Sequence, residues 1–294
     1  MKKIGPKIKS TACSHDLREW VPTTVDNLLK ELDHIANSCV QEDHLILFRG
    51  QSNSDWPLDS TFVRDSIKRI FGINVYSDLP NSIRHQVSFH RVIASLLLMK
   101  FGTIWKPSQE AFVKEKSHDI DPWYELLKHC QQYPEKYNSI YFNKGTFLID
   151  WTISQEIALY FGVFDGRGVK REISVTNGAI WAYDCSSTGK ILQIDKLEKT
   201  LNLMAEADFL NGEKTFPIMF HPQKQTNQIR AKNQKPTYIA QMDFRYDLAD
   251  VWADYEMRND EKVFVKLHIT QTLKKKLANY LESKGITEEF VYPH

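Results

Sequence analysis

Residues 145–164 read GTFLIDWTISQEIALYFGVF and decide the fold class. The apolar run Phe147–Trp151 predicts a short buried strand. It leads into Thr152-Ile153-Ser154-Gln155, a capping-box pattern, and then into the apolar helix Ile157–Phe161. Because strand and helix patterns also mix along the rest of the chain, the sequence predicts an α+β protein.

The flanking sequence supplies the other elements of this domain. Leu45–Phe48 predicts a buried strand that ends at Arg49-Gly50, and Thr176-Asn177-Gly178 predicts a hairpin turn between residues 173–175 and 179–183. Further strands are predicted at Tyr238–Phe244 and Val263–Ile269, and helices at residues 25–36, Ser82–Trp105, Trp123–Gln132 and Gln271–Lys284. We therefore predict a loose basic segment over residues 1–22 and a single α+β domain over residues 23–294, with a helix-rich N-terminal half and a mixed or antiparallel sheet core.

Composition excludes several classes of protein. The 38 Lys and Arg residues nearly balance the 37 Asp and Glu residues, for a net charge of +1, which argues against a generally basic nucleic-acid coat. No apolar run approaches the ~18–20 residues that cross a membrane, and the N-terminus lacks a signal-peptide pattern. Without a signal-peptide pattern we predict a cytoplasmic protein. The cysteines lie far apart and the histidines do not pair at metal-ligand spacing, so we predict no metal.

The first candidate site residues follow the strand Leu45–Phe48. A strand-end Arg49 beside Gly50 suits a bidentate clasp on phosphate or carboxylate, and Gln51 adds amide donors. The alternative is a structural Arg49 tied to a carboxylate such as Asp150. The nearby Trp56 and Leu58 are predicted to be core residues.

A second group lies at the strand-to-helix junction. Asp150 ends the strand, while Thr152 and Ser154 stand where the following helix begins. A helix N-terminus binds anions through its free N–H groups, so a nucleotide pyrophosphate suits this position. The alternative is that Thr152 is only a helix cap and Asp150 only an arginine partner.

The third group precedes the strand Tyr238–Phe244. Arg230 and Gln234 lie four residues apart in the segment 223–235, which carries four positive charges and no acid, whereas residues 243–261 carry a net charge of −5. The basic segment predicts a local anion-attracting patch, with a solvated loop as the alternative.

Several motifs occur in an order that resembles the FRG-domain family of bacterial proteins. Phe48-Arg49-Gly50 resembles the motif that names the family, and DWTISQEIALYF at 150–161 resembles its D-W-T-x-S-P-x-x-A-L-x-F stretch. NGAIWAYD at 177–184, Arg230 with Gln234 and Tyr238, and the ending TLKKKLANYLESKGITEEFVYP are similar to its later elements. The chain departs from the family pattern by lacking an Arg before Asp150, and by having Gln155 and Pro236 in place of Pro and Gly.

The resemblance implies an arrangement similar to the ADP-ribosyltransferase plan, with NAD as the substrate. Arg49 would then grip the NAD phosphates or ribose, Thr152 and Ser154 would scaffold the nicotinamide ribose, and Gln234 would take the place of the catalytic Glu. Because an amide supplies no negative charge, either Asp150 provides the carboxylate or the chain binds a nucleotide without efficient turnover. If the family Arg that is missing here binds ligand in relatives, this protein either binds its ligand differently or uses Arg230 in its place.

These expectations define two classes of function. The first is an ADP-ribosyltransferase-like transferase or NAD glycohydrolase of the toxin or defence type, with a small anionic nucleotide and a macromolecular acceptor as partners. Its catalytic residues would be Arg49, Asp150 and Gln234, and its nucleotide would contact Arg49, Gly50, Gln51, Thr152, Ser154 and Arg230. The second class is a non-catalytic ligand-sensing or protein-interaction module. We rank nucleic-acid binding last, because aromatic residues do not interleave with the basic segments.

Overall fold

The computed structural model describes residues 19–37, 45–61, 63–64, 148–165, 171–185, 218–220, 229–241 and 246–293. The predicted helices at Ser82–Trp105 and Trp123–Gln132, and residues 1–18, lie outside these ranges. The strands are β1 (Glu19–Trp20), β2 (Ile46–Gln51), β3 (Leu148–Thr152), β4 (Phe164–Asp165), β5 (Glu172–Ile173), β6 (Gly178–Asp184), β7 (Ile218–Phe220), β8 (Pro236–Ala240) and β9 (Phe264–Ile269). The helices are α1 (Val25–Asn37), α7 (Gln155–Val163), α10 (Ile229–Gln234), α11 (Leu248–Asn259), α12 (Gln271–Ser283) and α13 (Glu288–Val291).

Seven of the strands form one mixed sheet in the order β1-β9-β6-β2-β3-β8-β7. The pairs are antiparallel except for β1 with β9, which is parallel. β6 is buried along its whole length because it lies between β9 and β2 and is covered on both faces. The predicted α+β class with a mixed sheet is therefore confirmed. Glu19 and Trp20 pair with β9, so the described domain begins before residue 23, the predicted boundary.

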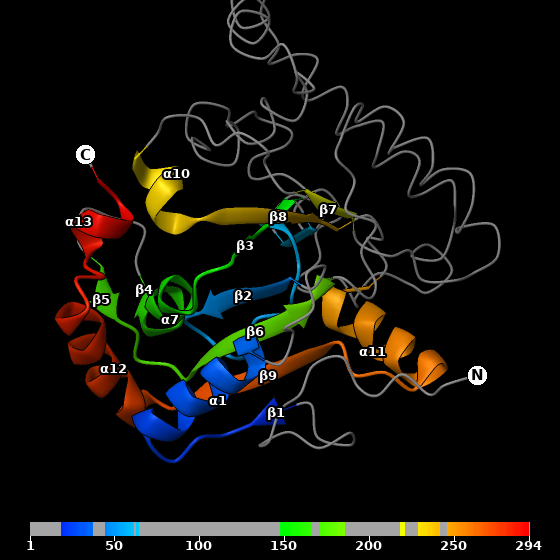
Figure 1. The fold of residues 1–294 in the computed structure, drawn as a ribbon, viewed down its shortest axis with the longest axis horizontal. Coiled ribbons are helices and arrows are strands. Elements are labelled where there is room, and N and C mark those ends of the chain that lie inside the picture. Colours follow the sequence, from blue (N-terminus) through cyan, green and yellow to red (C-terminus); the bar gives the residue numbers. More distant parts are fainter. Residues whose placement is uncertain are drawn as a thin grey trace, which may run out of the picture.

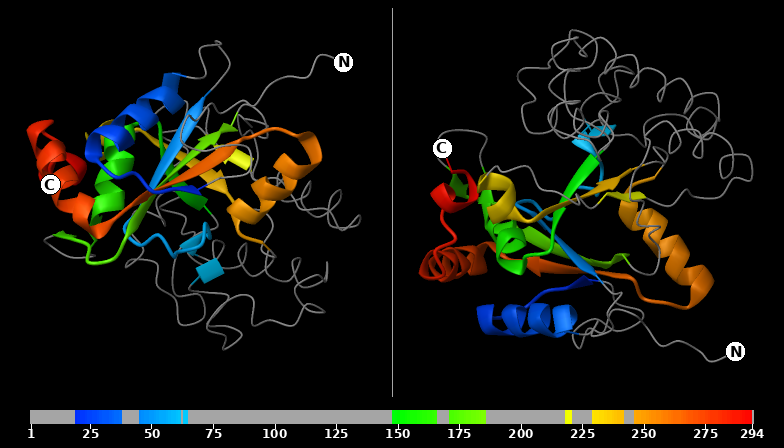
Figure 2. Two further views of the ribbon diagram at one scale, coloured as in Figure 1. Left: turned by 90° about the horizontal axis from the view of Figure 1, so that it is seen from below. Right: turned by 45° about the horizontal axis from the view of Figure 1, so that its top comes forward.

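Each face of the sheet carries its own apolar core (Figure 1). Alternate residues of a strand point to opposite faces, so Phe48 packs with α1, α7 and α12 while Leu47 packs toward α11. On the α11 face, the Trp252 ring stacks on Tyr183 with ring centroids 4.0 Å apart and meets Trp151 edge-on at 5.6 Å. Figure 2 shows α1 on one side of the sheet, beneath β1 and β9.

Local sequence signals explain the ends of several helices. Thr24 Oγ1 accepts a hydrogen bond of 3.1 Å from Asn27 N at the start of α1. Ser154, and not Thr152, is the N-cap of α7, with Ile157 N donating to Ser154 Oγ at 3.4 Å. Gly285 follows α12 with φ of +73°, a left-handed conformation that favours glycine. The predicted C-terminal helix and its glycine stop are confirmed.

The predicted hairpin around Asn177-Gly178 is wrong. β5 pairs with β4, whereas β6 pairs with β2 and β9. Asn177 instead joins two other loops, because its carbonyl accepts from Ser54 N at 2.7 Å and its side chain accepts from Gln271 N at 3.0 Å. These contacts occupy the dipeptide that would otherwise form the turn.

Two predictions near Arg49 also need correction. The strand β2 does not end at Phe48, because pairing with β6 continues through Arg49 to Gln51. Trp56 is not a core residue but is 39% exposed, whereas Leu58 is buried as predicted. Among the described residues, no helix combines the length and the apolar character needed to cross a membrane.

Candidate functional site

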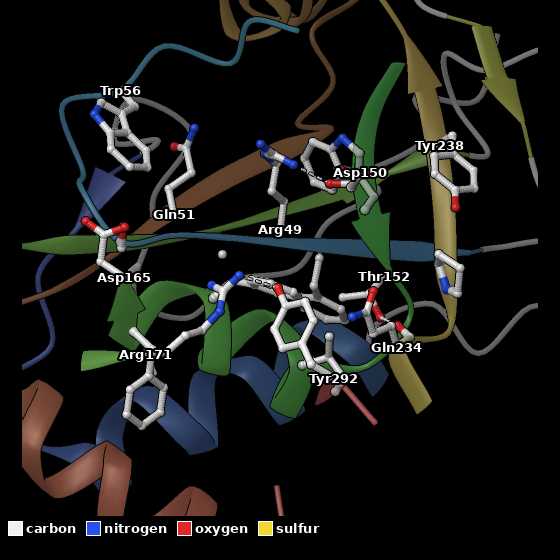
Figure 3. A pocket seen from close by; sticks show the side chains of 18 of the residues that line it. Arg49, Gln51, Trp56, Asp150, Thr152, Asp165, Arg171, Gln234, Tyr238 and Tyr292 are labelled. Atoms are coloured by element: carbon white, nitrogen blue, oxygen red, sulfur yellow. Dashed lines mark hydrogen bonds between the residues drawn. The ribbon is translucent and has the colours of Figure 1, made fainter. Parts of the chain in front are cut away.

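A pocket of about 550 Å³ lies between β2, β3, α10 and the residues that follow α13 (Figure 3). This volume is within the range of small-molecule sites. Its lining combines arginine side chains with aromatic rings and two carboxylates. The charged and aromatic residues are Arg49, Arg64, Arg171, Arg230, Asp150, Asp165, Phe48, Trp56, Trp151, Phe161, Phe164, Tyr238 and Tyr292.

The pocket opens where β2 and β3 lose register. These strands share a single registered pair, Phe48 with Thr152. Beyond this pair, Arg49 Nη1 donates a hydrogen bond to the backbone carbonyl of Asp150. Arg49 therefore contacts the main chain of Asp150, and the Asp150 side chain is exposed at the pocket.

Arg49 keeps unused hydrogen-bonding capacity in this pocket. Its Nε is buried and has no acceptor among the described residues. Burial lowers the pKa of Arg49 to about 10, opposed by the Asp150 carboxylate and assisted by the positive charge of Arg64. The guanidinium therefore stays charged at neutral pH, where an anionic ligand would stabilise it.

Gln51 is a rigid part of the wall. Its Oε1 accepts a hydrogen bond of 2.7 Å from Trp181 Nε1, and its Nε2 donates to the carbonyl of Pro57 at 3.2 Å. Both ends of the amide are thus held by the protein. Gly50 faces α7, where its backbone approaches Ala158 so closely that a side chain has no space.

Thr152 and Ser154 are engaged in local structure. Thr152 Oγ1 donates to the carbonyl of Gln234 at 2.7 Å and accepts from Ser154 N at 3.0 Å. Ser154 Oγ caps α7 and donates to Glu156 Oε2 at 2.9 Å. Thr152 lines the pocket, whereas Ser154 does not.

The last described residues complete the wall. Gln234 Nε2 donates to the carbonyl of Val291 at 2.9 Å, and Asn233 Nδ2 donates to the carbonyl of Phe290 at 2.7 Å. These two amides of α10 hold α13 in place and so position Tyr292 at the pocket.

Tyr292 lies beside two arginine side chains. Arg171 Nη2 donates to Tyr292 Oη at 2.5 Å, and its guanidinium carbon is 4.4 Å from the ring centroid. The Arg230 guanidinium carbon is 4.7 Å from the same centroid. Burial raises the pKa of Tyr292 despite both arginines, so the hydroxyl stays protonated at neutral pH.

The structure brings residues from three predicted groups to this one pocket. Arg49, Gly50, Gln51, Asp150, Thr152, Arg230 and Gln234 all line it. Their catalytic and binding roles stay predictions. Sequence reasoning missed Arg64, Arg171, Trp56 and Tyr292. Tyr292 belongs to the C-terminal stretch TLKKKLANYLESKGITEEFVYP, and Arg64 lies shortly after Phe48-Arg49-Gly50, but nothing local to Arg171 marks it.

The charges of the lining favour an anionic ligand. Four arginines face two aspartates, and the aromatic rings offer surfaces for a planar group. No group of three or more His, Cys, Asp or Glu side chains suited to a metal occurs in the part of the chain that the structure describes. A phosphate-bearing molecule with a planar ring therefore matches the chemistry of the pocket best.

Comparison with known proteins gives one match. Residues 44–169 match the family model of the FRG domain. No curated protein and no solved structure matches the chain. The matched segment includes Arg49, Asp150, Thr152 and Ser154, whereas Arg171, Arg230, Gln234 and Tyr292 follow it.

Proposed function

Because the chain contains an FRG domain, we propose that its pocket binds a small anionic nucleotide such as NAD. The observation that carries this proposal is the lining: four arginines and several aromatic rings around a space of about 550 Å³. Guanidinium groups bind phosphate oxygens in pairs, and aromatic rings stack on a base or a nicotinamide ring. The pocket supplies both kinds of contact.

In this proposal Arg49 binds a phosphate of the nucleotide. It retains a buried Nε–H with no acceptor among the described residues, and desolvation lowers the pKa of its guanidinium. A charged hydrogen bond contributes about 1.5–3 kcal/mol, so Arg49→Ala is expected to weaken nucleotide binding by roughly 10- to 150-fold.

The proposed reaction is cleavage of the bond between nicotinamide and ribose. Nicotinamide leaves with the bonding electron pair, and the positive charge left on the ribosyl group is stabilised by the Asp150 carboxylate. Water, or a nucleophile of a macromolecular acceptor, then bonds to the ribose carbon and passes its proton to Asp150. This chemistry corresponds to an NAD-consuming or ADP-ribosyltransferase-like enzyme of the toxin or defence type.

A second candidate function is a non-catalytic ligand-sensing or protein-interaction module. The hydrogen bonds of Gln234, Thr152 and Ser154 favour it, because these groups are engaged with the protein itself. In this case the pocket would bind a nucleotide without breaking it.

One experiment tests binding and turnover together. We expect calorimetry to detect NAD binding to the wild type and to Asp150→Asn, and nicotinamide release to occur with the wild type but not with Asp150→Asn. Asp165→Asn is the matched control, since Asp165 is the other carboxylate of the pocket. Binding without release supports the non-catalytic module, and absence of any nucleotide binding overturns both functions.

A further inference from the structure

Two arginine side chains from distant parts of the chain contact the same aromatic ring, that of Tyr292. Arg171 directly precedes β5, and Arg230 belongs to α10. Their guanidinium carbons lie 4.4 Å and 4.7 Å from the centroid of the Tyr292 ring. The fold thus places two positive charges beside a single side chain that carries none at neutral pH.

Neither arginine forms an ion pair within the described residues. The described ion pairs join Arg258 with Asp254, and both Lys266 and His268 with Glu19. Glu288 accepts from the backbone N of Arg171 at 3.3 Å, so its hydrogen bond does not involve the guanidinium. Cation–π contact with Tyr292 offsets part of the repulsion between Arg171 and Arg230, but it supplies no counter-charge. An anion bound beside both arginines would supply it.

The pair is separate from Arg49. In Figure 3 the Arg49 side chain extends from β2 away from Arg171 and Tyr292. Arg49 has Asp150 and Arg64 as its charged neighbours, whereas Tyr292 has Arg171, Arg230, Asp150 and Glu288. The Asp150 carboxylate acts on the pKa of both Arg49 and Tyr292.

We infer that Arg171 and Arg230 form a second anion subsite, so that the pocket takes a nucleotide with phosphate groups at two separate positions. This inference rests on the proposed nucleotide-binding function and narrows its ligand class. NAD carries its phosphates together in one pyrophosphate. NADP adds a phosphate on a ribose at a separate position, and it is therefore the better match to two subsites.

Calorimetric titration with NAD and with NADP tests the inference. We expect NADP to bind the wild type at least about tenfold more tightly, the effect of one additional charged hydrogen bond. Arg230→Gln should weaken NADP binding more than NAD binding and so remove this preference. Lys232→Gln is the matched control, since Lys232 belongs to the same helix but is exposed and does not line the pocket. It should keep the preference for NADP.

Arg171→Gln provides an independent variant. It should also remove the preference for NADP, while far-ultraviolet circular dichroism checks that the protein is folded. Equal affinity of the wild type for NAD and NADP, or an equal loss of both in Arg230→Gln, overturns the inference and leaves the proposed function standing. If neither dinucleotide binds the wild type, the proposed function is overturned, and the inference with it.

Discussion

Arg49 Nη1 donates a hydrogen bond to the backbone carbonyl of Asp150, a residue 101 positions later in the chain. The guanidinium joins β2 and β3 where their ladder has already ended at Phe48 and Thr152. Its Nε is buried without an acceptor among the described residues, and its pKa is lowered to about 10. Arg49 is therefore held as a cation in surroundings that oppose its charge, as expected of a binding group and not of a stabilising one.

Replacing Arg49 by Met is expected to separate stability from binding. Removing a poorly solvated charge should leave the free energy of unfolding unchanged or raise it by about 1 kcal/mol, while nucleotide binding weakens by roughly 10- to 150-fold. Urea denaturation and calorimetry at pH 7 measure the two effects. Arg258→Met is the control, because Arg258 forms an exposed pair with Asp254 on α11 and should change neither quantity much. A loss of more than about 2 kcal/mol in Arg49→Met would contradict this reading.

Lys274 predicts a pH dependence of stability. Its Nζ donates to the carbonyl of Ser52 at 2.7 Å, and burial lowers its pKa from 10.5 to about 8, opposed by Asp165. Between pH 8 and 10.5 the unfolded chain binds this proton more strongly than the folded protein does. The unfavourable effect of burying the charged amine is therefore complete below pH 8 and disappears as the pH rises to 10.5.

The stability of the wild type relative to Lys274→Met should accordingly rise between pH 8 and pH 10.5. Denaturation at several pH values measures the difference in free energy of unfolding between the two proteins. Groups that titrate alike in both proteins do not contribute to this difference. Lys275→Met is the matched control, since Lys275 is the next residue of α12 and is exposed. A difference between wild type and Lys274→Met that is flat or falls with pH would refute the expected role of the buried amine.

Gly50→Ala is expected to destabilise the fold strongly. A Cβ at this position would lie 1.8 Å from the Ala158 carbonyl oxygen and 2.5 Å from Gly162 N, so backbone would have to move. Overpacking of this kind should destabilise by about 3 kcal/mol or more. Gly285→Ala is the comparison, because its added Cβ meets no atom within 4 Å and only the φ of +73° is unfavourable, at about 1 kcal/mol. Thermal denaturation should show a larger loss of stability for Gly50→Ala than for Gly285→Ala.

Gln234→Glu tests the role that the family resemblance gives to Gln234. The Gln234 amide donates to the carbonyl of Val291 at 2.9 Å, and a carboxylate there would repel that carbonyl. We expect faster hydrogen exchange over residues 288–292 and no increase in nicotinamide release. Gln271→Glu, at the exposed start of α12, should leave exchange over those residues unchanged. A gain in nicotinamide release would show instead that Gln234 occupies a reacting position.

Trp56 and Leu58 should respond in opposite ways to truncation. Leu58→Ala removes a side chain buried with the α11 core and should lower the free energy of unfolding by about 2–5 kcal/mol. Trp56→Ala affects an exposed ring at the pocket, so we expect a stability change within about 0.5 kcal/mol and weaker nucleotide binding. Equal loss of stability in the two variants would argue against Trp56 as part of the pocket.

Local sequence patterns predicted the elements whose boundaries are set locally. The apolar face of α1 follows Thr24, and α12 stops before Gly285, because caps and glycine stops act within a few residues. The run at Val263–Ile269 became β9 because its apolar residues alternate with Lys266 and His268, which are partly exposed, as in a strand with one face buried.

The remaining features depend on distant partners. The Asn177-Gly178 dipeptide has the residues of a hairpin turn, but contacts with Ser54 and Gln271 decide its structure. The pocket also depends on distant residues. Arg171 and Tyr292 lie 121 positions apart, and no sequence pattern around Arg171 predicts their contact. The three predicted groups of polar residues, in contrast, were visible because each follows or precedes a strand.

The order of the strands has a consequence for folding kinetics. β1 contacts β9 through Glu19 and Lys266, 247 residues apart, and the strands beside β2 also come from distant positions in the chain. Each such pairing requires a long loop to close before its contacts form, and proteins rich in these contacts fold slowly. We therefore expect refolding on a timescale of seconds or longer, with binding competence regained only when the whole sheet has assembled, so that a nascent or partly folded chain would have no nucleotide pocket.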